Sequence, residues 1–290
     1  MAVTDRTVAV RGLTLADAWR SFRTAIGLGW AIEANWSDPF LFAVYTLAKP
    51  LAAAGILIVM FQVITQGQNP EFLQFLIVGS ALWNVVFGVM AGLVQSILED
   101  RERYRMLKYI VVTPASLFPF LLGRSLARVV VSFVAVALTL LVGVVFLGVE
   151  LRPNFVILVP ATIVGVLAVI GLGIFMAGWC LQLRQEAWHY PEAIAGALYL
   201  VSGAIFPIDV LPGILHPMAY ASPTTWWLEA SRRGLMGHGS PGVIGGLPDA
   251  LVMLFLVAST AITIPLALAA FGWFMRRARQ AGVLDMVTGS

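Results

Sequence analysis

Residues 99–114 read EDRERYRMLKYIVVTP, a dense run of charge set between two long apolar stretches. Seven charged residues fall within its first ten positions: Glu99, Asp100, Arg101, Glu102, Arg103, Arg105 and Lys108. A charged side chain at the centre of a bilayer costs roughly 2.5–3.5 kcal/mol, so this run cannot lie in hydrocarbon. The stretch therefore predicts a water-facing turn that joins two membrane helices.

The composition indicates a polytopic membrane protein. Of the 290 residues, 60% are apolar and only 11% are charged, whereas soluble domains carry about 25% charge. The single cysteine, Cys180, excludes a disulfide within the chain and a cysteine-based zinc site. Residues 1–12 lack the apolar core of a cleavable signal peptide. Basic residues cluster at the ends of apolar segments, which indicates membrane orientation rather than nucleic-acid binding.

Six apolar segments are candidates to cross a hydrocarbon core of about 30 Å. They are residues 40–64, 73–97, 117–147, 156–180, 193–206 and 249–275. The fifth is short, because Pro207 follows it directly. Residues 207–237 are then apolar but broken by three prolines, Pro212, Pro217 and Pro223. Non-helical backbone at membrane depth must be satisfied by protein or a cavity, so we expect a re-entrant helical hairpin, with an extracellular loop as the alternative.

Before the first span, apolar residues recur every three or four positions at Leu15, Trp19, Phe22, Ile26 and Trp30. This pattern predicts an interfacial helix over residues 13–36 that lies in the headgroup layer; a helix packed on another domain is the alternative. The expected fold is all-α, with an interfacial helix, six transmembrane helices and a re-entrant hairpin between the fifth and sixth. The chain, residues 1–290, is expected to form one transmembrane domain without a nucleotide-binding domain.

Basic residues also predict the orientation of the chain. With the N-terminus inside, twelve arginines and lysines fall on the cytoplasmic side and three on the opposite side. This bias predicts that both termini are cytoplasmic.

Catalytic motifs are missing from the sequence. The three histidines do not form an HExxH pattern, and neither lysine belongs to a G-x-x-x-x-G-K-[ST] phosphate loop. The acidic residues fall at segment ends or in loops, whereas ion-coupled carriers place them within spans. We therefore expect no catalysis by this chain, and any energy for transport must come from a partner.

Two stretches carry a family resemblance. Glu102–Pro114 is similar to the E-R/x-G-T-L-E-x-L-x-x-T-P turn of ABC type-2 exporter permeases, and Phe206 through Arg232 is similar to their late re-entrant stretch. The chain resembles this group, which includes daunorubicin-type drug exporters and lipid-linked polysaccharide exporters, over nearly its whole length. Tyr104, Arg105 and Lys108 depart from the pattern, since glycine, threonine and glutamate are common there.

The resemblance implies a division of labour between chains. The turn at residues 99–115 would be a coupling helix that docks on a separate ABC ATPase, which holds ATP and magnesium; this chain would bind no cofactor. Two ATPase copies would pair with two permease subunits, as a homodimer or heterodimer, in a prokaryotic plasma membrane. The cargo would be a drug, lipid or lipid-linked glycan, because the spans carry almost no charge. The expected ATPase contacts are Glu99, Asp100, Arg101, Glu102, Arg103, Tyr104, Arg105, Lys108 and Pro114.

Other residues have two readings each. Asn84, Gly88, Gly92 and Ser96 form a small-residue stripe that suits helix packing, or else a translocation path or dimer seam. Arg124 and Arg128 favour snorkelling to lipid phosphates over pairing with an acidic partner, and Lys49 has a similar choice between snorkelling and an inward cavity.

The late stretch supplies candidates for an outer gate. Glu229 is spaced to pair with Arg232 or Arg233 on one helical face. Tryptophans there would lie at the headgroup level, either touching cargo or anchoring the chain. The candidate gate residues are Phe206, Pro207, Trp226, Trp227, Glu229 and Arg232.

Two rival functions remain open at this stage. An integral membrane enzyme acting on lipids would use His189, Glu186 and Glu192, which lie near the turn between the fourth and fifth segments. An ion-coupled secondary carrier would instead show a flux that depends on an ion gradient and needs no ATP.

Overall fold

The structure is a computed structural model of the chain that describes residues 15–34, 70–107, 109, 117–183 and 189–282, together with 40, 44, 48, 52, 55–56, 58–63 and 66. Among these residues the regular elements are helices, and no strand occurs. The longer helices are α1 (Leu15–Ala34), α3 (Pro70–Leu98), α5 (Leu117–Leu147), α6 (Phe155–Cys180), α7 (Tyr190–Val201), α9 (Pro223–Met236) and α10 (Asp249–Gln280). The shorter elements are η1 (Glu99–Arg103), η2 (Ile208–Val210), η3 (Gly213–Leu215), α8 (His216–Ala221) and η4 (Ile244–Gly246).

Four helices of the described part are long and apolar enough to cross a membrane. They are α3 with its following turn, α5, α6 and α10. The second, third, fourth and sixth predicted segments are thereby confirmed to within a few residues. The fifth forms α7, whose 12 residues reach only about 18 Å and cannot span a bilayer. The first predicted segment, 40–64, lies largely outside the described residues, so the described part supports four spans and not six.

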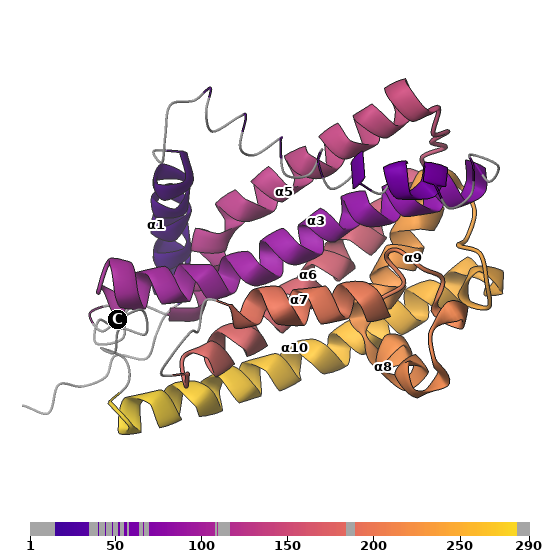
Figure 1. Cartoon of the computed structure of the whole chain (residues 1–290). Helices are drawn as coiled ribbons and strands as arrows, with labels where there is room; N and C mark the ends of the chain where they lie inside the picture. The colour runs from indigo at the N-terminus through magenta and orange to yellow at the C-terminus, as the bar shows by residue number, and fades with distance from the viewer. Residues whose placement is uncertain are drawn as a thin grey trace, which may run out of the picture.

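Helix α3 is the centre of the bundle and contacts α5, α6, α7 and α9 (Figure 1). In the most apolar 18-residue stretch of α3, 78% is buried inside the protein. The corresponding shares are 28% for α5, 28% for α6 and 22% for α10. The three outer helices leave large apolar side chains such as Phe146 and Leu254 exposed. Exposed apolar faces on spanning helices are the surface expected to contact lipid.

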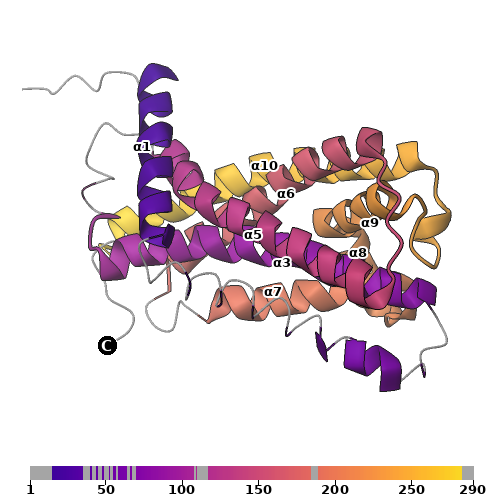
Figure 2. The ribbon, with the colours of Figure 1, turned by 90° about the horizontal axis from the view of Figure 1, so that it is seen from above.

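Helix α1 lies across one end of the bundle, perpendicular to its long axis (Figures 1 and 2). It packs closely on α5 because Gly29 has no side chain at the contact. A Cβ at Gly29 would lie 2.5 Å from the backbone oxygen of Arg124. Trp19 and Trp30 are exposed. The predicted interfacial helix is therefore present as a helix, while its place in the headgroup layer stays a prediction.

Helices α8 and α9 lie at the opposite end of the bundle (Figure 1). Pro223 begins α9, and Gly237 ends it in a left-handed conformation at φ +80°. Between these residues α9 is buried almost throughout, packed against α3, α6 and α10. Re-entry of this helix pair into a bilayer stays a prediction.

Candidate functional site: the charged turn and its cavity

Helix α3 continues into a single π-helical turn, η1, which holds the first part of the charged run. Glu99, Asp100 and Arg101 are buried there, with exposed fractions of 8%, 0% and 2%. The sequence predicted that the whole run faces water, and for these three residues that prediction is wrong. Charge alone excluded hydrocarbon, but it could not distinguish water from a protein interior that supplies ionic partners.

The partners come from the first turns of α5. Arg124 donates through Nη2 to Glu99 Oε2 at 3.0 Å, and the same nitrogen lies 3.3 Å from Asp100 Oδ1. Arg128 donates through Nη2 to Glu99 Oε1 at 3.3 Å and through Nη1 to Gln95 Oε1 at 2.6 Å. The favoured expectation that both arginines snorkel to lipid is therefore replaced by its alternative, pairing with acidic side chains.

A third arginine joins the turn to α6. Arg101 pairs with Glu102 at 2.5 Å and donates to the backbone oxygen of Leu181 at 3.4 Å. Arg124 and Arg128 are joined to Glu99 and Asp100, and the Arg101–Glu102 pair lies on the same turn. These three acids and three arginines, in two groups, are here called the ion network. Because its formal charges cancel, the network can be buried at a much lower cost than isolated ions.

The remaining part of the turn is exposed. Arg103, Tyr104, Arg105 and Tyr109 face outward and are here called the turn surface. The Tyr104 ring connects this surface to the ion network, since its centroid is 5.5 Å from the Arg124 guanidinium carbon and 5.7 Å from that of Arg103. Lys108 and Pro114 lie outside the described residues.

Arg105 holds a left-handed backbone conformation with φ of +50°. This conformation is costly for residues with a Cβ. It reverses the chain after η1, where the Met106 N–H donates to the Asp100 backbone oxygen at 2.9 Å. The chain therefore reverses at Arg105, a strained residue within the turn surface.

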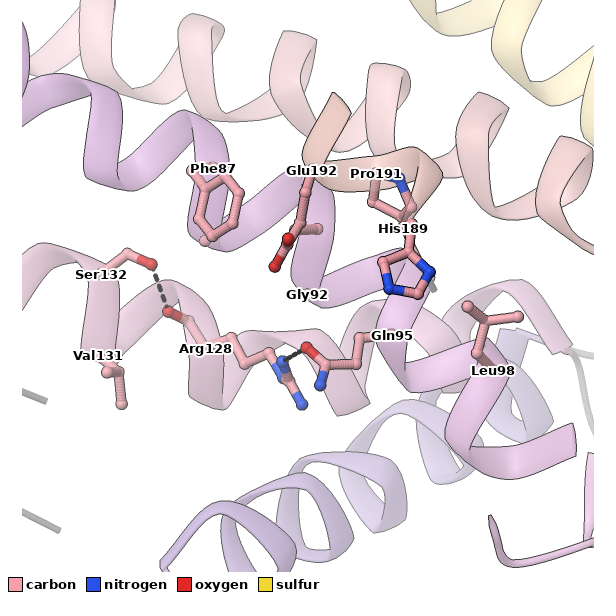
Figure 3. Close-up of a pocket in the computed structure, with 12 residues that line it drawn as sticks. Phe87, Gly92, Gln95, Leu98, Arg128, Val131, Ser132, His189, Pro191 and Glu192 are labelled. Carbon is pink, nitrogen blue, oxygen red and sulfur yellow. Dashed lines mark hydrogen bonds between the residues drawn. The ribbon is translucent and has the colours of Figure 1, made fainter. Parts of the chain in front are cut away.

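A cavity of about 500 Å³ opens beside the ion network, between α3, α5 and the start of α7 (Figure 3). Arg128 belongs to both the network and the cavity wall, and its hydrogen-bond partner Gln95 also lines the cavity. The other lining residues are Phe87, Gly88, Ala91, Gly92, Leu98, Val131, Ser132, His189, Pro191 and Glu192. The lining therefore combines apolar side chains with polar and charged ones.

The small-residue stripe has a packing role along this wall. A Cβ at Gly92 would lie 2.6 Å from Arg128 Cδ, and one at Gly88 would collide with the Ser132 hydroxyl. Asn84 and Ser96 bond to backbone oxygens of their own helix. Gly88 and Gly92 also line the cavity. Their place in a translocation path or a dimer seam stays a prediction.

At the opposite end of the bundle, Glu229 pairs with Arg233 at 2.8 Å, which confirms one of the two expected pairs. Arg233 also binds Asp249 at 2.7 Å and the backbone oxygen of Leu247 at 2.6 Å, so it fastens the segment after α9. Arg232 instead donates to the backbone oxygen of Ala204 at 2.8 Å and stacks on Phe75 at 3.8 Å. Both arginines have structural contacts within the chain.

The two tryptophans of α9 lie inside the protein. Trp226 is 5% exposed and stacks on Phe255 at 4.5 Å, and Trp227 is 1% exposed against Gly165. Neighbouring helices cover both rings, so they have packing roles within the chain, while their depth in the membrane and their place in an outer gate stay predictions. Phe206 and Pro207 are partly buried in the segment that follows α7.

Comparisons with known proteins fit this arrangement. The sequence profile of the family described as ABC-2 type transporter matches residues 28–236, well over half of the chain. The chain belongs to the ABC-2 type transporter family. The match runs from α1 to the end of α9 and so includes the ion network, the cavity and the α9 arginines.

Two relatives of this ABC-2 permease are proteins named "Probable multidrug ABC transporter permease YbhS", from Escherichia coli strain K12 and from Escherichia coli O157:H7. Each is 24% identical over 199 residues, which cover 66% of this chain and 49% of the relative. The chain thus spans about half the length of the curated relatives it matches.

Some residues of the site were not expected from the sequence. Gln95 and Phe87 of this ABC-2 permease line the cavity. Neither was a candidate in the sequence, where the nearest signal was the small-residue stripe beside them. The pairing of Arg124 and Arg128 did have a signal, since they lie one helical turn apart at the start of the span that follows the acidic residues. His189 and Glu192, considered for a lipid enzyme, meet at the cavity, while Glu186 lies outside the described residues. Among the described residues no group of three or more histidine, cysteine or acidic side chains could hold a metal.

Proposed function

We propose that this chain is the membrane-spanning subunit of an ATP-driven exporter, and that the turn surface docks on a separate ABC ATPase. The supporting observation is the connection between surface and spans. Arg103, Tyr104 and Arg105 are exposed, and the residues just before them are fixed to α5 and α6 by the ion network. A force applied to the turn surface would therefore move α3, α5 and α6 together.

The proposed cargo is hydrophobic or amphipathic. The cavity beside the network is lined by both apolar and polar side chains, a combination that suits an amphipathic molecule. The relatives named as multidrug permeases support a cargo of this kind. We further propose that two such subunits pair in a prokaryotic plasma membrane over two ATPase copies, with both termini cytoplasmic.

Reversing charge on the turn surface tests the docking proposal. The variant is Arg103→Glu with Arg105→Glu, co-expressed with an ABC ATPase that co-purifies with the wild-type chain. The matched control is Arg276→Glu with Arg279→Glu, because these arginines are also exposed and lie on α10 at the same end of the bundle. We expect the first pair to abolish co-purification of the ATPase and ATP-dependent uptake of cargo into inverted vesicles, since complementary charge gives such interfaces their specificity.

The control pair should retain both properties. Undiminished ATPase binding by the Arg103 and Arg105 variant would refute docking at the turn surface. ATP-independent pumping by the isolated chain would refute the exporter proposal as a whole.

A further inference from the structure

The carboxylate of Glu192 is a charged group of the cavity that has no role in the ion network. Glu192 lies in the first turn of α7 and is exposed. Figure 3 shows its side chain and that of His189 projecting from α7 toward the space between α3 and α5, opposite Arg128. No ion pair joins Glu192 to another residue of the described part of the chain.

The arginine in the same cavity is already neutralised. Arg128 bonds Glu99 and Gln95, and the network to which it belongs has three negative and three positive charges. A ligand anion would therefore have to compete with Glu99 for Arg128. The remaining uncompensated charge among the lining residues is the negative charge of Glu192, since histidine adds positive charge only when protonated.

The rest of the wall suits an organic ion rather than a small inorganic one. Phe87, Leu98 and Val131 supply apolar surface, and an aromatic ring such as Phe87 attracts a cation through its face. The cavity volume, about 500 Å³, lies within the range usual for small-molecule sites, about 300–1,000 Å³. Charge and shape together select a bulky cation with apolar substituents.

We propose that this cavity binds amphipathic organic cations, with the Glu192 carboxylate as counter-ion and the Phe87 ring in the apolar wall. The proposal deepens the proposed function, and it rests on that function only in taking the bound cation as cargo. Binding itself requires neither ATP nor an ATPase, so the two ideas can fail separately.

Tetraphenylphosphonium and tetraphenylborate provide the test, because they have nearly the same shape and opposite charge. Equilibrium binding of each ion to the purified full-length chain in uncharged detergent is measured at pH 8, above the ordinary pKa of imidazole, about 6.5. We expect the wild-type chain to bind the cation more tightly than the anion. Glu192→Gln should weaken binding of the cation roughly fivefold to tenfold and leave binding of the anion unchanged or stronger, since one partly solvated ion pair is lost.

Two further variants keep the test decisive. Glu192→Asp retains the charge and should keep most of the cation preference. Glu150→Gln removes an exposed carboxylate from the loop between α5 and α6, outside the cavity, and should behave as wild type. Equal thermal unfolding temperatures of all variants show that the fold is retained. If Glu192→Gln fails to fold, two results decide: the ion preference of the wild-type chain, and the cation binding of Glu192→Asp compared with that of Glu150→Gln.

Wild-type binding of tetraphenylborate as tight as that of tetraphenylphosphonium would overturn the proposal, and so would unchanged cation binding by Glu192→Gln. If cation binding is absent while ATP-dependent efflux with the partner ATPase persists, the exporter proposal survives and this inference fails. If the cation binds but no ATPase ever associates, the reverse holds.

Discussion

Removing the Arg124 guanidinium should destabilise the chain strongly, because it leaves a buried carboxylate without its cation. In Arg124→Gln, Glu99 keeps Arg128 at 3.3 Å, but Asp100, which is fully buried, loses the arginine that lies 3.3 Å from it. Breaking a buried ion pair from one side costs about 3–5 kcal/mol. Since Glu99 retains a partner, we expect the lower value, about 3 kcal/mol, in the free energy of unfolding.

The assay is reversible unfolding in mixed micelles with increasing dodecyl sulfate, followed by far-ultraviolet circular dichroism. The matched control is Arg152→Gln, the same chemical change at an arginine whose pair with Glu150 is 3.2 Å long and largely exposed. Exposed pairs contribute little, so this control should cost at most about 0.5 kcal/mol.

A second substitution identifies the cause of the loss. Adding Asp100→Asn to Arg124→Gln removes the uncompensated charge and should restore about half of the lost stability. If Arg124→Gln cost no more than Arg152→Gln, or if Asp100→Asn brought no recovery, the account of the ion network as a set of mutually dependent buried charges would be wrong.

Two further predictions concern backbone and packing. Arg105→Gly should stabilise the chain by about 0.5 kcal/mol, because relief of the left-handed backbone strain exceeds the entropy cost of glycine. Arg105→Ala keeps a Cβ and should bring no gain. Both variants are measured by the same unfolding assay. Gly165→Ala should lower the free energy of unfolding by about 1–3 kcal/mol, because its Cβ would enter the Trp227 ring. Gly196→Ala is the control and should be neutral or stabilising, because its Cβ meets nothing within 4 Å. A loss of stability at Gly196 equal to that at Gly165 would contradict this packing.

Long apolar segments were the part of the fold that sequence predicted well. The bounds of α5 agree with the predicted 117–147, because hydrophobicity and length together define a spanning helix. The short fifth segment was also recognisable from Pro207, although it does not form a span. These features depend on local composition, which the sequence carries directly.

The interior of the charged turn could not be predicted in the same way. Glu99 and Arg124 are 25 positions apart, and their contact depends on how α3 and α5 pack. Similarly, α9 carries three charged residues in an otherwise apolar stretch, and their burial follows from covering by α3, α6 and α10. Tertiary packing, rather than local pattern, decides both cases.

The cancelling charges of the ion network have a consequence for ionic strength. Salt screens solvent-exposed charges over about 8–10 Å at physiological concentrations, but buried pairs much less. Where the turn surface docks on an ABC ATPase as proposed, added potassium chloride should therefore weaken binding through Arg103 and Arg105, while the link from η1 to α5 and α6 stays intact. Once such a complex has formed, the movement that it transmits to the helices should depend little on the salt concentration.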